Sequence, residues 1–194
     1  MMHKKNIKYF INLCKILILL CFATSCGGLS NHYDVKIDPS FSPEQRANVA
    51  QALYAWTQAV PELSFSISME DCPVTIKSDQ ICIINTSLAY VKQREQSDAL
   101  AFTWTNNVDQ NSECYIPTDD PISQDQAAQV EIITHELGHA LGLSHTGPGT
   151  IMCVSAWEEG TGCGSEFITC QDVGQYKILR GEQAPVCKAN DSGM

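Results

Sequence analysis

Two histidines and a glutamate in the second half of the chain stand at a spacing that suits metal chemistry. His135 and His139 are four residues apart, so their side chains would lie on the same face of a helix, one turn apart. Two imidazoles at that spacing can reach one Zn²⁺ ion at about 2.0–2.1 Å. Glu136 follows the first histidine, where its carboxylate can act as a general base toward a metal-bound water. The pattern predicts a helix that carries a catalytic metal site.

The segment after this helix offers a third ligand. Gly142 has no Cβ atom, so the chain can leave the helix there with a positive φ. Such a sharp exit can bring His145 round to the same metal ion. Three protein ligands leave the fourth position open for water, which is typical of a catalytic zinc ion and not of a structural one.

The motif from His135 to His145, HExxHxxGxxH, resembles the signature of the metzincin clan of zinc endopeptidases. The resemblance implies a Met-turn, in which a methionine forms an apolar floor under the three histidines. Met152 stands at the matching position, after a Gly-Pro-Gly loop. Within the clan, the segment His139–His145 is similar to the matrixins, the matrix metalloproteinase-like group. Astacin-like and serralysin-like relatives carry a tyrosine two residues after this methionine, whereas the present chain has Val154.

The resemblance also implies an activity. We expect a zinc-dependent endopeptidase with one catalytic Zn²⁺, which hydrolyses peptide bonds in proteins through a zinc-bound water activated by Glu136. An extended peptide should pair with an edge strand, for which Leu100–Trp104 is the candidate. The loop Cys153–Gly160, with Trp157, should form one wall of the specificity pocket. The alternatives are a catalytically silent, surface-anchored binding protein that keeps the metzincin fold, and a structural zinc domain.

A first long helix is predicted from a capping signal and an apolar face. Ser42 can cap it, Pro43 suits the first helical position, and Gln45 can complete a capping box. Pro61 should end it. Its apolar residues recur at helical spacing, which favours core positions for Val49, Leu53, Trp56 and Val60.

Turn-rich separators divide most of the remaining chain into short strand-like runs. These runs are Val35–Ile37, Leu63–Ile67, Val74–Lys77, Ile81–Ile84, Leu100–Trp104 and Tyr115–Ile116. A capping box over Ser123–Gln126 should open the second long helix, which runs to about Leu141, and Thr169 with Asp172 can cap a last one. We therefore expect an α+β fold: a metzincin-like catalytic domain in which a small twisted mixed sheet packs on two long helices, followed by a Met-turn and a C-terminal helix.

Residues 1–25 have the order of a secretory signal: lysines, then an apolar run, then small residues. The stretch Ala23–Cys26 resembles the lipobox of bacterial lipoproteins, in which the cysteine is lipidated. We therefore expect a signal peptide over 1–25, a lipid-anchored tether over 26–33 and the zinc peptidase domain over 34–194. This predicts an exported protein, held by Cys26 at the membrane of the cell envelope or surface. The alternative is a signal peptide cut nearby that releases a free secreted protein.

The charge of the chain argues against one class of partner. The formal net charge is −10, and without the first 25 residues 8 basic residues face 22 acidic ones. No basic stripe remains to neutralise phosphates, so we expect no nucleic-acid partner. The expected partners are protein or peptide substrates, and we expect a monomer. Calcium has one weak candidate site, the adjacent pair Asp119 and Asp120, for which a solvated turn is the favoured interpretation.

Export explains the cysteines. The chain has 10, of which Cys14, Cys21 and Cys26 lie in the first 26 residues, so seven follow. In an oxidising compartment these predict disulfides, with at least one cysteine left over. Cys170 with Cys187 and Cys153 with Cys163 are the two pairs that we expect. A zinc site made of cysteines is the alternative, but no CxxC spacing supports it.

Overall fold

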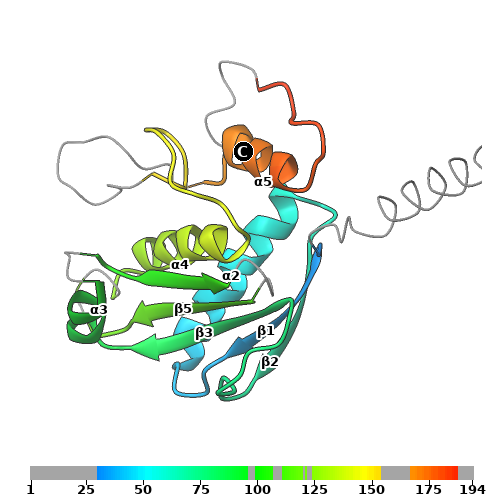
Figure 1. The fold of residues 1–194 in the computed structure, drawn as a ribbon. Helices are drawn as coiled ribbons and strands as arrows, with labels where there is room; N and C mark the ends of the chain where they lie inside the picture. The colour runs from blue at the N-terminus through cyan, green and yellow to red at the C-terminus, as the bar shows by residue number, and fades with distance from the viewer. Residues whose placement is uncertain are drawn as a thin grey trace, which may run out of the picture.

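A five-stranded sheet with the order β2-β1-β3-β5-β4 forms the base of the structure. The computed structural model describes residues 30–95, 99–106, 111–119, 121, 124–153 and 167–187. The elements are β1 (His32–Ile37), α2 (Pro43–Ala59), β2 (Ser64–Met69), β3 (Gln80–Thr86), α3 (Leu88–Glu95), β4 (Phe102–Asn106), β5 (Asn111–Pro117), α4 (Gln126–Ala140) and α5 (Cys170–Leu179). Figure 1 shows α2 and α4 side by side along the sheet, with α5 beyond them.

The sheet is mixed, as expected. β1 pairs in parallel with β2 and with β3, and β3 pairs in parallel with β5. β4 alone among the described strands runs antiparallel, and it lies at the edge next to β5. The predicted α+β architecture, a small mixed sheet on two long helices followed by a C-terminal helix, is confirmed.

Helix α2 carries the core contact that holds α4 in place. The capping box of Ser42 and Gln45 is present, and the predicted core residues of this helix are buried. Trp56 is fully buried, and its indole Nε1 donates a hydrogen bond to the main-chain oxygen of Thr134 on α4 at 2.9 Å. The two long helices are therefore joined by apolar packing and by one directed bond, just before the first histidine of the motif.

The predicted strand Val74–Lys77 is wrong. Residues 71–79 form no strand, and the side chain of Val74 is fully exposed. Pro73 removes one backbone donor, and a disulfide between Cys72 and Cys82 fastens the start of this segment to β3. The β-branched residues there have no neighbouring strand to pair with, so their local preference is overridden.

Several predicted boundaries shift for identifiable reasons. β1 begins at His32, because residues 32–34 pair with β2, which itself runs from Ser64 to Met69. Helix α4 begins at Gln126: its cap is Asp125, whose carboxylate accepts the N–H of Ala128, while Ser123 lies outside the described residues. The predicted capping box began at Ser123, whereas the observed cap is Asp125, whose side chain satisfies a free N–H of the first helical turn.

The sequence pattern does not predict helix α3, because this helix is short and buries little apolar surface. Val91 is its one buried residue. The carboxylate of Asp119 accepts the N–H of Leu88 at 2.7 Å, so this candidate calcium ligand helps to start a helix. Tyr90 packs beside Phe102 and Tyr115, whose stacked rings have centroids 4.5 Å apart. Asp120 lies outside the described residues.

One of the two predicted disulfides is present in the described part of the chain, and the other is not tested there. Cys170 and Cys187 form the expected disulfide. Cys153 is also disulfide-bonded, and its predicted partner Cys163 lies outside the described residues. Within the described part of the chain, Cys114 is the free cysteine, and it is buried. In the same part, no helix is both long and apolar enough to cross a bilayer.

Candidate metal centre

The three histidines of the motif converge on one point. The Nε2 atoms of His135 and His139 lie 3.1 Å apart, and Nε2 of His145 lies 3.3 and 3.0 Å from them. Three nitrogens that bind one zinc ion tetrahedrally at about 2.0–2.1 Å stand about 3.3–3.4 Å from one another. The observed triangle is close to that size, so these nitrogens could hold a metal ion.

Main-chain carbonyls orient two of the rings. Nδ1 of His135 lies 2.7 Å from the oxygen of Ile151, and Nδ1 of His139 lies 2.9 Å from the oxygen of Leu143. A carbonyl can only accept, so both Nδ1 atoms carry the proton. Each Nε2 then presents a lone pair toward the shared point, which is the tautomer that a metal ion requires.

The turn that follows α4 brings the third histidine round. Gly142 has φ +95°, a conformation that other residues adopt at a cost, and it ends the helix as the sequence predicts. The N–H of Leu143 donates a hydrogen bond to the main-chain oxygen of Gly138 at 2.9 Å. The turn in which the chain leaves α4 is therefore stabilised by a bond to the helix. Farther on, the N–H of Thr146 bonds to the oxygen of Met152 at 2.8 Å and fastens the segment that carries His145.

Met152 is fully buried against the helix that carries the histidines. A Cβ built on Gly138 would overlap its Sδ and would lie 3.1 Å from its Cε. The same Cβ would lie 3.2 Å from a ring carbon of Trp56. A glycine between the two histidines thus lets the thioether and the indole pack directly on the backbone of α4, which places an apolar floor there.

The C-terminal helix supports this floor through Asp172. This carboxylate is completely buried and caps α5, since its Oδ2 accepts the N–H and the hydroxyl of Thr169 at 2.8 and 2.7 Å. The same oxygen accepts the N–H of Ile151 at 3.2 Å. Ile151 therefore links α5 to His135, because its N–H is held by Asp172 while its carbonyl holds the ring.

Glu136 lies on the sheet side of α4. Its side chain is buried, and its Oε2 accepts a hydrogen bond of 2.6 Å from the hydroxyl of Thr103 on β4. The pKa of Glu136 is raised to about 7, chiefly by burial, while the bond from Thr103 lowers it and the charge of Glu95 raises it. A carboxyl with a pKa near neutrality can both take up and release a proton under physiological conditions.

The electrostatics of the histidines favour neutral rings. The pKa of His139 is lowered to about 4, chiefly by burial, with electrostatic repulsion between its protonated form and His135 as the next cause. Burial is also the main cause of the lowered pKa values of His135 and His145. All three imidazoles are thus unprotonated at neutral pH, and three lone pairs face one another unless a cation separates them.

Residues 32–161 match the family model described as Matrixin. The chain belongs to the matrixin family. The matched segment runs from β1 through Met152, so it contains all three histidines, Glu136 and the sheet beside them. Matrixin family proteins bind zinc, which agrees with the geometry of the histidine cluster in this matrixin.

Solved structures resemble this matrixin more distantly. One is high choriolytic enzyme 1, a hatching enzyme zinc-protease from Oryzias latipes, the medaka fish, with 18% identity and a TM-score of 0.38 over 59% of this chain and 44% of the other. Another is myroilysin, with 16% identity and a TM-score of 0.40 over 65% of this chain and 57% of the other. The chain thus spans about half the length of each. Comparison with curated proteins found no match.

Sequence reasoning identified the histidine cluster but missed two of its supports. The structure brings together His135, His139 and His145, and it packs Met152 on Gly138 between the first two, while the side chain of Glu136 contacts Thr103. The sequence predicts Thr103 only as part of a strand and Asp172 only as part of a helix cap. No local signal distinguishes a strand threonine that touches a carboxylate from one that does not. Cys26, Val154 and Trp157, for which the sequence suggested an anchor, a missing tyrosine and a pocket wall, lie outside the described residues.

Proposed function

We propose that this matrixin is a zinc-dependent endopeptidase, with His135, His139 and His145 as the zinc ligands and Glu136 as the general base. The observation that carries the proposal is the triangle of Nε2 atoms, 3.0–3.3 Å on each side. Carbonyl-held Nδ1 atoms turn two of these nitrogens toward the common point. Coordination by three residues, with a buried carboxylate next to the first, is the arrangement of catalytic zinc sites and not of structural ones.

When it is bound by the three histidines, zinc would polarise the scissile carbonyl and make a water molecule more acidic. Glu136 would take a proton from that water on a carboxylate oxygen as the water oxygen bonds to the scissile carbonyl carbon, and it would then donate the proton to the amide nitrogen as the C–N bond breaks. Its pKa of about 7 suits both steps. Burial beside β4 keeps this carboxylate away from bulk water, so the proton passes between the reacting groups.

The substrate is proposed to be a protein or peptide in extended form. β4 is an edge strand of the described sheet, so its outer backbone groups can pair with an added strand. Helix α4 packs against β4, and a peptide along the segment Leu100–Trp104 would therefore run beside the histidine cluster. Backbone pairing accepts many sequences, which is consistent with an endopeptidase that cleaves within chains.

The test is cleavage of casein by the purified protein, with and without a chelator. Parent protein should cleave casein, lose that activity with the chelator and regain it with added Zn²⁺. Glu136→Ala should keep its zinc and lose most of the activity, by about a hundredfold or more, because proton transfer by a positioned group contributes that much. A Glu136→Ala protein that cleaves casein as fast as the parent would refute the assignment, and equal cleavage with the chelator would refute the metal.

We also propose that the matrixin is exported and held at a membrane by lipid on Cys26, as a monomer. The support is the order of residues 1–26 and the disulfides in the described part of the chain, which suit an oxidising compartment. Cells expressing the parent should incorporate labelled palmitate into this protein, and Cys26→Ala should not. Release of unlabelled parent protein into the medium would favour the free secreted form.

A further inference from the structure

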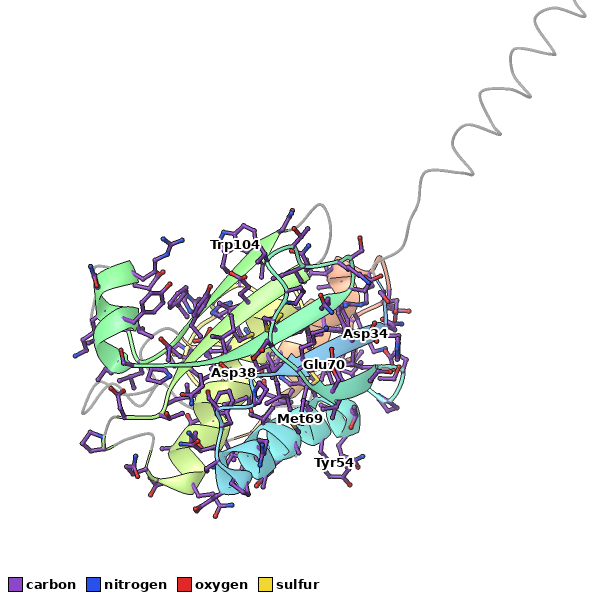
Figure 2. All side chains as sticks on the ribbon, turned by 90° about the horizontal axis from the view of Figure 1, so that it is seen from below. Asp34, Asp38, Tyr54, Met69, Glu70 and Trp104 are labelled. Atoms are coloured by element: carbon purple, nitrogen blue, oxygen red, sulfur yellow. A yellow bond between two sulfur atoms is a disulfide. The ribbon has the colours of Figure 1, made fainter. Side chains whose placement is uncertain are left out.

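The pleat of β4 and β5 determines which side chains reach helix α4. Thr103 pairs with Cys114 across the two strands, and Sγ of Cys114 lies 3.8 Å from the main-chain oxygen of Glu136. Side chains alternate along a strand, so Thr103 faces α4 while Phe102 and Trp104 face away. Figure 2 places Trp104 at the margin of the sheet, where it is half exposed. One hydroxyl of the edge strand is thus directed at the helix.

That hydroxyl has two acceptors, both on Glu136. Oγ1 of Thr103 lies 2.6 Å from the carboxylate Oε2 and 3.1 Å from the main-chain oxygen. A hydroxyl carries one proton, and the shorter contact to a group that can be ionised is the stronger bond. The main-chain oxygen is also close to the thiol of Cys114. The principal bond of Thr103 therefore goes to the carboxylate.

We propose that Thr103 is a positioning residue, whose hydroxyl holds Oε2 of Glu136 and so sets the direction of the carboxylate. This rests on the proposed function, in which that carboxylate transfers the proton. This bond engages Oε2 of Glu136 and does not involve the other carboxylate oxygen. The methyl branch of threonine restricts χ1, which helps the hydroxyl to keep its direction. Without this bond, the buried carboxylate would sample other rotamers.

Two substitutions at this position separate the hydroxyl from the shape of the side chain. Thr103→Val keeps the shape and removes the donor, while Thr103→Ser keeps the donor. Thr57→Val is the control, since the hydroxyl of Thr57 on α2 bonds to the main-chain oxygen of Tyr54 and not to Glu136. The measurements are kcat and KM for a fluorogenic peptide, and the zinc content of each protein.

Thr103→Val should lower kcat about tenfold or more at unchanged KM and unchanged zinc content, as loss of a supporting hydrogen bond commonly does. Thr103→Ser should recover most of kcat, and Thr57→Val should match the parent. An unchanged kcat for Thr103→Val beside an active parent would overturn the inference and leave the proposed function standing. An equal loss in Thr103→Ser would also overturn it, because the hydroxyl would then not matter.

A second measurement needs no catalysis. In metal-free protein, Thr103→Val should lower the melting temperature by about 3–8 °C, because the buried carboxylate loses its donor. In the Glu136→Ala background the same substitution should lower the melting temperature much less, since only the weaker contact with the main-chain oxygen remains. An equal decrease in melting temperature in both backgrounds would overturn the inference, whether or not the parent cleaves peptides. If the parent is inactive and the coupling is present, the proposed function fails while the positioning by Thr103 stands.

Discussion

The thioether of Met152 fills the space that a Cβ on Gly138 would need, with Trp56 beside it. Met152 and Trp56 are both fully buried, so neither can swing aside without opening the core. The glycine lies between His135 and His139, the two histidines of the helix. The close approach of Met152 to Gly138 therefore fixes the distance between the rings of His135 and His139 and the apolar floor.

Gly138→Ala is expected to destabilise the protein, although alanine is the better helix former. Overpacking of a full core costs about 1–3 kcal/mol, which exceeds the gain of up to about 1 kcal/mol in helix propensity. The melting temperature should fall, and zinc affinity should fall with it. Thermal unfolding with and without zinc checks both effects.

Gly174→Ala on α5 is the matched control for this change. Its added Cβ would meet Ala184 and Pro185 at 3.8 and 3.9 Å, which is ordinary contact. That variant should be neutral or slightly more stable than the parent. Equal melting temperatures for the two variants would show that the packing of Met152 on Gly138 does not contribute to the stability of the protein.

Asp172→Ala is expected to weaken zinc binding from a distance. Its carboxylate holds the N–H of Ile151, whose carbonyl orients the ring of His135. Without it, Ile151 and Thr169 lose their acceptor inside the core, and each unsatisfied donor costs about 1–3 kcal/mol. Zinc affinity, measured by competition with a chromogenic chelator, should fall about 10–100-fold.

Gln171→Ala serves as the comparison for Asp172, because Gln171 is the adjacent residue of the same helix and is exposed. It should leave zinc affinity unchanged. A normal affinity in Asp172→Ala would mean that the turn keeps His135 in place without this carboxylate.

His139→Ala should abolish metal binding. The parent is expected to hold about one zinc ion per chain, since the three histidines form one site. Chelation should lower the melting temperature of the parent, because an ion that binds only the folded state stabilises it by mass action. Neither effect should be seen in His139→Ala.

Elemental analysis and thermal unfolding measure both outcomes. His32→Ala is the control, since His32 lies on β1 and contacts Ser64 and Ser66, not the motif histidines. Full zinc content in His139→Ala would place the metal elsewhere.

Cys114 is expected to resist thiol reagents in the folded protein. It is buried, and burial raises the pKa of its thiol to about 12. A raised pKa keeps the thiol protonated at pH 8.5, and the thiolate is the form that reacts. Unfolding returns the pKa toward its ordinary value and exposes the sulfur, so reactivity should then appear.

Titration with a chromogenic disulfide at pH 8.5 checks this, with and without denaturant. The parent should show one more thiol than Cys114→Ala in denaturant and no difference between the two without it. Rapid labelling of Cys114 in the folded state would indicate that β5 opens next to Glu136.

The elements that sequence reasoning placed well share one property: their signals are local. The capping boxes at Ser42 and Thr169 form between residues three apart, so sequence and structure agree there. Val74–Lys77 has local strand preference but no partner strand, and pairing depends on distant residues. Helix α3 buries one residue and starts at a carboxylate about thirty positions away in sequence, which no local pattern reports.

The sequence alone determined the chemistry of the centre. Helical spacing puts His135 and His139 on one face, and a glycine that can adopt positive φ returns His145 to it, so this site is encoded within eleven residues. Tertiary structure alone decided what surrounds those residues. Thr103 comes from the sheet, Met152 from the turn and Asp172 from the last helix. Their roles depend on distances between separate elements, and packing sets such distances, whereas the covalent chain does not.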